Sequence, residues 1–120
     1  MEIEIHQINN IKVAEVIAEN ILIASAEDVL DLLGSLYFQD VDKIILHEKN
    51  ITPDFFDLKN GIAGELLQKF SNYRVRLAIV GDFSFHKSKS MQDFIFESNK
   101  LGKINFVATQ PEAINRLLNS

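Results

Sequence analysis

The chain has 120 residues, enough for one domain with its own core and too few for two, because a chain of this size buries about 65% of its unfolded surface. Hydrophobic residues make up 47% of the sequence, which excludes an intrinsically disordered chain. A formal charge of -5 argues against nucleic acid and anionic membranes as partners. The absence of cysteine excludes disulfides, thiolate metal sites and thiol catalysis.

The N-terminal segment MEIEIHQINN lacks the basic stretch and the apolar core of a secretory signal. No apolar run approaches the ~20 residues that a membrane-spanning helix needs. We therefore expect a single domain over residues 1–120, located in the cytoplasm and without a membrane partner.

The first half of the chain predicts a hairpin, a helix and a strand. Residues 2–8 and 11–18 form two short runs that the turn dipeptide Asn9-Asn10 separates. A helix is expected from Ser25, whose hydroxyl can cap it. Its apolar residues recur at i, i+3, i+4 and i+7: Val29, Leu32, Leu33 and Leu36. The β-branched run 43–47 is typical of a buried strand.

The second half predicts a regular alternation of helices and strands. A second helix starts near Asn60 or Gly61, and the run 75–82 is the clearest central strand. A third helix ends near Gly102, a strand covers residues 104–107, and Thr109 with the following Pro and Glu indicates the start of a last helix. This order predicts an α/β sandwich with a mainly parallel sheet, an N-terminal antiparallel hairpin and four helices.

The order of elements also resembles a known domain. From Leu77 onward, LAIVGDFSFHKSKSMQDFIFESNKLGKINFVATQPEAINRLL resembles the second half of the STAS domain of sulfate transporters and anti-sigma-factor antagonists. The first half, with a hairpin, a helix, a strand at KIILH and a helix opened by DLKNGIAGELL, follows the same order. The resemblance implies a small STAS-like sandwich that binds a protein partner.

Several short sequence segments are similar to those of another family. The segments ITPDFFDLKNGIAGELLQKF, NYRVRLAIVGDF and ESNKLGKINFV resemble an uncharacterised bacterial family, domain of unknown function 4180. This resemblance implies a bacterial source and no particular activity.

STAS antagonists carry a phosphorylatable Ser or Thr in an Asp-Ser-Ser-Gly-like segment that a partner kinase modifies. The matching segment here, Asp57-Leu58-Lys59-Asn60-Gly61, keeps the Asp and the Gly but has no hydroxyl between them. Thr52 is the nearest hydroxyl, five residues before Asp57 and out of register. The sequence therefore departs from the phosphorylation mechanism of that family.

The first candidate site is the turn at the start of the second helix. Free N–H groups at a helix start, the glycine at position 61 and the charge of Lys59 together could hold a phosphate or a carboxylate. The alternative is an ordinary turn in which Asp57 or Asn60 caps the helix. Phe55 precedes this turn, and one of two adjacent phenylalanines in an extended segment is expected at the surface, where it can anchor a partner. The alternative is that the loop buries both rings.

The second candidate site follows the carboxyl end of the central strand, the edge at which open α/β sheets place ligands. Asp82, Ser84, His86 and Ser88 contain the residue types of a hydrolytic triad, but the sequence has no Gly-x-Ser-x-Gly elbow. We keep Asp82 and His86 as a secondary candidate edge, with a solvated helix-capping loop as the alternative.

The three histidines, His6, His47 and His86, are far apart in the sequence and lack the i, i+4 spacing of helical zinc motifs. We therefore expect neither a metal nor another cofactor. Arg74 and Arg76 alternate on the approach to a strand, so they could share one face and pair with acids such as Asp40 or Asp42.

Our first hypothesis is a non-enzymatic, cytosolic regulatory module whose surface contacts another protein of unknown identity. Phe55 would anchor the partner, Gly61 would permit close approach, and Lys59 would meet an acidic group.

Two other functions stay open at this point. One is a small-ligand-binding protein or small enzyme that uses the strand ends, with Asp57 and Lys59 on one side and Asp82 and His86 on the other. The other is a structural homodimer, in which the edge strand 2–8 pairs with its copy.

Overall fold

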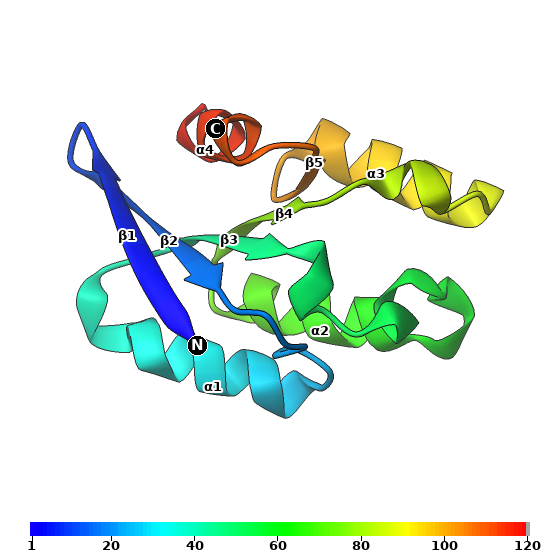
Figure 1. Cartoon of the computed structure of the whole chain (residues 1–120), viewed down its shortest axis with the longest axis horizontal. Coiled ribbons are helices and arrows are strands. Elements are labelled where there is room, and N and C mark those ends of the chain that lie inside the picture. Colours follow the sequence, from blue (N-terminus) through cyan, green and yellow to red (C-terminus); the bar gives the residue numbers. More distant parts are fainter. Residues whose placement is uncertain (120) are drawn as a thin grey trace.

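The computed structural model describes residues 1–119 and confirms the predicted α/β class (Figure 1). The five strands are β1 (Glu2–Ile8), β2 (Ile11–Ile17), β3 (Lys43–His47), β4 (Arg76–Val80) and β5 (Ile104–Val107). The four helices are α1 (Ala26–Leu36), α2 (Ile62–Asn72), α3 (Lys89–Leu101) and α4 (Gln110–Leu118). Short 3₁₀ helices lie between them: η1 (Tyr37–Gln39), η2 (Glu48–Asn50), η3 (Pro53–Phe56), η4 (Leu58–Asn60) and η5 (Phe83–Phe85).

The strands lie side by side in chain order, β1-β2-β3-β4-β5. The pair β1 and β2 is antiparallel, as predicted, and the other three pairs are parallel. The hairpin turn places Asn9 and Asn10 at φ values of 52° and 71°, the left-handed conformation that a two-residue hairpin turn requires. The predicted hairpin and parallel sheet are both confirmed.

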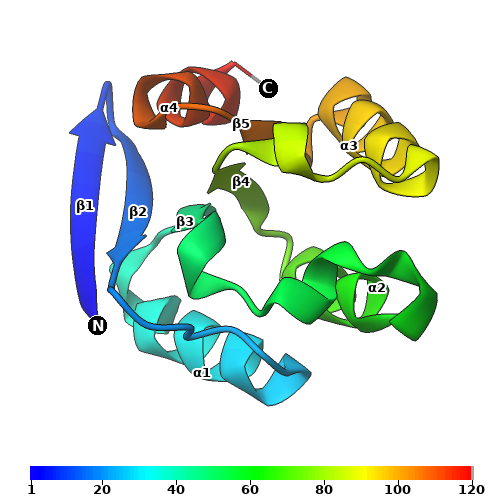
Figure 2. The same cartoon turned by 45° about the vertical axis from the view of Figure 1, so that its right-hand side comes forward.

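The helices cover the two faces of the sheet unequally. Figures 1 and 2 show α1 and α2 together on one side of the sheet and α4 on the other. The larger core contains side chains of α1, α2 and α3, such as Leu32, Phe70 and Phe94, packed against one face of the strands. The smaller core lies under α4 and contains Ala113 and Leu117. A single helix thus covers the second face, which leaves room there for polar side chains.

The helix boundaries follow from local capping interactions. The hydroxyl groups of Ser25, Ser88 and Thr109 accept hydrogen bonds from backbone N–H groups in the first turns of α1, α3 and α4. Gly102 ends α3 at a φ of 81°. None of the helices within residues 1–119 is long and apolar enough to cross a bilayer.

Candidate functional site

In the predicted turn at residues 57–61, the polar side chains form hydrogen bonds with nearby backbone groups. The Oδ1 atom of Asp57 accepts a hydrogen bond from the backbone N–H of Lys59 at 3.3 Å. The side chain of Asn60 donates to the carbonyl oxygen of Asp54 at 3.0 Å and accepts from the N–H of Ile62 at 2.9 Å. Gly61 caps α2 at a φ of 77°. Asp57 and Asn60 therefore act as turn residues, and Lys59 is exposed beside them.

The prediction that Phe55 is a surface anchor is wrong, because its side chain is only 1% exposed. Only an extended segment would turn one of the two adjacent rings to the surface. Residues 53–56 instead form η3, and in a 3₁₀ helix two adjacent side chains do not point to opposite sides. The Phe55 ring packs edge-on against Phe56 at 4.9 Å between centroids and joins the larger core.

The carboxyl ends of β3 and β4 carry a histidine and a carboxylate in contact. The Nε2 atom of His86 lies 2.7 Å from Oε2 of Glu48. The imidazole ring stacks on Phe56, with the centroids 4.3 Å apart and the planes at 12°. Gly81 lies against Glu48, so closely that a Cβ atom at position 81 would be 2.7 Å from the glutamate Cβ. This edge is thus packed, with His86 fixed by two neighbours.

The other residues predicted for this edge do not join that pair. Asp82 accepts hydrogen bonds from the N–H and the hydroxyl of Ser84, at 3.1 and 2.6 Å, and these bonds lower the pKa of Asp82. The hydrogen bond of the Asp57 carboxylate stays within its own turn, while His86 contacts Glu48. The structure therefore shows no shared proton path between Asp57, Asp82 and His86, and Ser84 has a carboxylate rather than a histidine as its partner.

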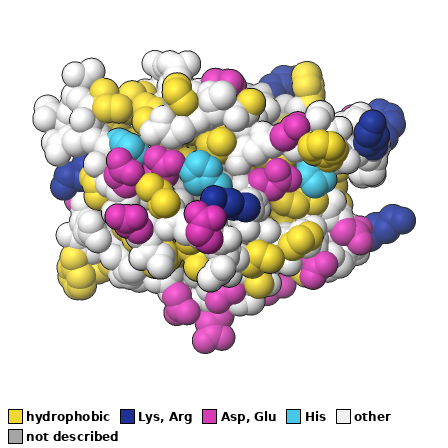
Figure 3. All heavy atoms as spheres, viewed as in Figure 1, with side chains coloured by type: hydrophobic (Ala, Val, Ile, Leu, Met, Phe, Trp, Pro, Cys, Tyr) yellow, Lys and Arg dark blue, Asp and Glu magenta, His cyan; other side chains and the backbone are white. Residues whose placement is uncertain are grey.

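The second face of the sheet holds two histidines on one buried carboxylate. Glu15 of β2 is 7% exposed. Its Oε1 lies 2.8 Å from Nε2 of His6 on β1, and its Oε2 lies 2.7 Å from Nε2 of His47 on β3. Gln110, the first residue of α4, donates to Oε1 at 3.3 Å. Three elements thus supply partners to one side chain of β2. Figure 3 shows histidines beside acidic side chains on the surface seen in the view of Figure 1.

The environment of Glu15 favours its ionised form. Burial raises the pKa of this carboxyl, but hydrogen bonds from His47, His6 and Gln110 outweigh burial and hold the pKa below its ordinary value of 4.5. Because a carboxylate has no proton to donate, both imidazoles present an Nε2–H to it. The cluster of His6, Glu15 and His47 is therefore a polar network inside a mostly apolar sheet.

A groove of about 1050 Å³ lies at the opposite edge of the sheet, at the amino ends of β4 and β5. Side chains of α2, α3 and α4 form its walls. Its apolar lining includes Leu67, Val75, Phe94, Leu101 and Ile104. Its charged lining is entirely basic: Arg74, Arg76, Lys100, Lys103 and Arg116. These are all three arginines of the chain and two of its lysines, in a protein of net charge -5.

Two of the arginines also hold helix ends in place. The guanidinium of Arg76 donates to the carbonyl oxygens of Leu117, Gly102 and Arg116, at 2.6, 2.8 and 3.1 Å. Arg116 donates to Oδ1 of Asn105 at 2.9 Å and to the carbonyl oxygen of Asn99. These carbonyls lie at the ends of α3 and α4, where the helix dipole favours positive charge. Burial, and then the charge of Arg116, lower the pKa of Arg76.

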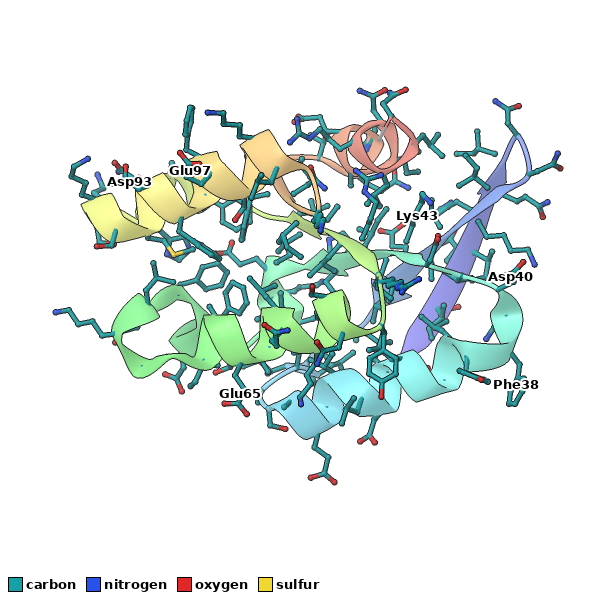
Figure 4. All side chains as sticks on the ribbon, turned by 180° about the vertical axis from the view of Figure 1, so that it is seen from behind. Phe38, Asp40, Lys43, Glu65, Asp93 and Glu97 are labelled. Carbon is teal, nitrogen blue, oxygen red and sulfur yellow. The ribbon has the colours of Figure 1, made fainter. Side chains whose placement is uncertain are left out.

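The expected pairing of these arginines with Asp40 or Asp42 is therefore wrong. The backbone N–H of Arg76 binds the carbonyl oxygen of Asp42, while its side chain turns to the helix ends. The ion pairs within residues 1–119 involve none of the five basic side chains of the groove. Figure 4 shows the acidic side chains of the flanking helices, Glu65, Asp93 and Glu97, pointing away from the space between α2 and α3.

An exposed aromatic surface lies at the end of α1. The side chains of Tyr37 and Phe38 are 74% and 93% exposed, and Figure 4 shows Phe38 pointing away from the body of the protein. Neither residue belongs to a motif or a candidate site of the sequence. Their position in a short 3₁₀ helix after α1 gives no periodic pattern from which exposure could be predicted.

The architecture defines a small α/β protein with a sequentially ordered sheet, a packed carboxyl edge and a basic groove at the amino edge. The model of the family described as Domain of unknown function (DUF4180) matches residues 8–117, and the chain belongs to this family. Neither the curated proteins nor the solved structures contain a significant match. The resemblance to the STAS domain therefore stays a prediction from topology.

Proposed function

We propose that this protein is a non-enzymatic regulatory module of the bacterial cytoplasm that binds an acidic segment of a partner protein in its basic groove. The observation that carries the proposal is the charge of the groove. Five of the 12 basic side chains of the chain line it and none of the 17 acidic ones does. A concave basic surface attracts a negatively charged segment of a partner.

The shape and lining of the groove favour a peptide segment over a simple anion. Its volume of about 1050 Å³ exceeds the space that an inorganic anion needs, and apolar side chains line it between the charges. Some N–H groups of Arg76 and Arg116 already donate hydrogen bonds to the ends of α3 and α4 or to residues beside them. Lys100 and Lys103 are exposed and have no such partner within residues 1–119. An acidic segment with interspersed apolar residues matches both parts of this lining.

The proposal keeps the predicted class of function and moves the contact surface away from the turn at Lys59. Phe55 is buried, and Asp57 and Asn60 are engaged within the turn. The alternative of a small enzyme at the carboxyl edge has less support, because His86 is fixed between Glu48 and Phe56. A homodimer through the edge strand β1 stays a prediction; Glu2 and Glu4 on that strand disfavour pairing of two identical edges.

Fluorescence anisotropy with a labelled acidic peptide of glutamate and leucine tests the proposal. A peptide of lysine and leucine of equal length serves as the control ligand. The test variant is Lys100→Glu with Lys103→Glu, and the matched control variant is Lys59→Glu with Lys87→Glu, which carries the same net charge outside the groove. All four lysines are exposed, so both variants are expected to fold.

We expect wild type and the Lys59/Lys87 variant to bind the acidic peptide alike, and the Lys100/Lys103 variant to bind it more than tenfold more weakly. Added salt should weaken the wild-type complex, because exposed charges are screened. Equal losses in both variants, or no binding by wild type, would contradict the proposal. A loss confined to the Lys59/Lys87 variant would instead place the anion site at the predicted turn.

A further inference from the structure

We propose that Glu4, His6 and Glu15 bind a divalent transition-metal ion on the face of the sheet that α4 covers only in part. One ligand atom of each of these three side chains lies within 4.8 Å of the others. Two carboxylates and an imidazole are donor types that Zn²⁺ and its neighbours accept. This site lies on the hairpin, apart from the basic groove, and does not depend on the function proposed for that groove.

The register of the hairpin brings the three residues together. Glu4 lies directly opposite Glu15 in the antiparallel ladder, and His6 lies opposite Val13, one diagonal step away on the same face. Such cross-strand neighbours are close enough for their side chains to meet. Because two strands joined by a two-residue turn have a fixed register, this set of donors is formed by a short local segment of the chain.

The negative charges of Glu4 and Glu15 favour a bound cation at this position. Two carboxylates directly opposite one another on one face of a sheet repel, and such a pair is destabilising. Within residues 1–119, Glu4 takes part in no ion pair, while Glu15 has only the two imidazoles and Gln110 as partners. A divalent ion between the two carboxylates would convert this repulsion into attraction.

Residues around the site orient the carboxylate of Glu15. His47 donates from Nε2 to Oε2 of Glu15 at 2.7 Å, and this bond turns Oε1 toward His6. Hydrogen bonds of this kind fix the orientation of ligating side chains and raise their affinity for metal. His47 is thus a positioning residue for the site. The Nε2 atom of Gln110 lies 3.3 Å from Oε1 of Glu15 and 3.4 Å from Nε2 of His6, so the α4 terminus closes one side.

Metal binding would exchange a proton for the ion. Oε1 of Glu15 and Nε2 of His6 share one proton across 2.8 Å. A divalent ion that takes both atoms as ligands displaces this proton from Nε2 of His6, and the proton moves to Nδ1 of the ring or to solvent. With three protein ligands, a tetrahedral ion keeps one position for water or another ligand.

Isothermal titration calorimetry with Zn²⁺, and the visible absorption of Co²⁺ added to the protein, test the proposal. The test variants are Glu15→Gln and His6→Gln, with Glu4→Gln as a third whose exposed side chain makes misfolding improbable. The matched control is His86→Gln, which removes the one histidine outside the cluster. Circular dichroism checks the fold of each variant.

We expect wild type and His86→Gln to bind one ion per chain with equal affinity, and the three ligand variants to bind it more than tenfold more weakly. His47→Gln should weaken binding while leaving the Co²⁺ absorption maxima in place, because it keeps the ligand set. The proposal would be overturned if wild type bound neither ion, if Glu4→Gln bound as tightly as wild type, or if His86→Gln lost as much affinity as the ligand variants.

Discussion

Gly81 lies so close to Glu48 that a Cβ atom at position 81 would be 2.7 Å from both Cβ and Oε1 of the glutamate. The Gly81→Ala variant must therefore displace the Glu48 side chain from its contact with His86. We expect the free energy of unfolding to fall by about 1–3 kcal/mol, the usual cost of overpacking. Urea denaturation measures it.

The control for this prediction is Gly64→Ala. Gly64 lies within α2, and a Cβ atom there would have no neighbour within 4 Å. Alanine favours the helix, so this variant should gain about 0.5–1 kcal/mol. Opposite signs for two Gly→Ala changes would establish that the neighbourhood of Gly81, not the lost glycine, decides the outcome; equal signs would contradict the prediction.

The stability that Glu15 contributes should depend on pH. Its pKa in the folded protein lies below the ordinary 4.5, so its contribution is complete above that value and disappears as the pH falls through the folded pKa. Relative to wild type, Glu15→Gln should cost about 1–3 kcal/mol near neutral pH. This difference should shrink as the pH falls below 4.5 and through the folded pKa, because protonation makes Glu15 resemble glutamine.

Denaturant unfolding of wild type and Glu15→Gln at several pH values measures this difference and cancels the contributions of other titrating groups. A difference in unfolding free energy that is constant over this range would show that the hydrogen bonds of Glu15 do not favour its ionised form.

Arg76 should stabilise the fold through its hydrogen bonds as well as its charge. Its guanidinium donates hydrogen bonds to three carbonyl oxygens at the ends of α3 and α4. The Arg76→Gln variant leaves these acceptors without their donor and should lose about 2–3 kcal/mol. Arg76→Lys keeps the charge but cannot reach all three acceptors, so its loss should be intermediate.

Arg74→Gln is the comparison for Arg76. Arg74 lines the same groove but is exposed and makes no side-chain hydrogen bond within residues 1–119. Its replacement should change the unfolding free energy by no more than about 0.5 kcal/mol. Thermal or urea unfolding of the three variants separates a structural role of the groove from its proposed role in binding, because only Arg76 should affect stability strongly.

Gly61 at the predicted turn should stabilise the fold because it adopts a left-handed backbone conformation. Gly61 has a φ of 77°, and a Cβ atom there would meet no other atom within 4 Å. Gly61→Ala should therefore cost about 1 kcal/mol through its backbone alone, and Gly61→Asn less, because asparagine tolerates the left-handed conformation.

The Gly61→Asn variant also tests whether the turn contacts the partner, because it should leave the turn folded. If the partner uses the groove, this variant should bind the acidic peptide as tightly as wild type. Weaker binding by a folded Gly61→Asn would return the contact surface to the turn.

The positions of the helices and strands could be predicted because the interactions that set them are local. The caps at Ser25 and Thr109 join atoms three residues apart, and the stop at Gly102 reflects the conformation of one residue. The strands 43–47 and 104–107 were predicted with the bounds that the structure has, since each is an apolar run between turn signals. The hairpin turn at Asn9 is local in the same way.

The candidate sites could not be predicted because they join residues far apart in the chain. His47 and Glu15 are 32 positions apart, and Arg76 meets the carbonyl of Leu117 at a separation of 41. The spacing of the histidines along the sequence therefore gave no sign of the cluster, although strand alternation already placed Glu4 and His6 on one face. Phe55 was assigned to the surface because a 3₁₀ helix leaves no periodic pattern in four residues.

By itself the sequence determined the fold class, the order of elements and their caps, because hydrophobic periodicity and capping act within a few residues. Only the tertiary structure decided which charges meet. The parallel register of β3 and β4 with their neighbours gathers the arginines at one edge of the sheet, and the pairing of β1, β2 and β3 places two histidines on one carboxylate. The turn fixes the register of β1 on β2 locally, but the parallel register of β2, β3 and β4 is fixed by packing between segments far apart in the chain.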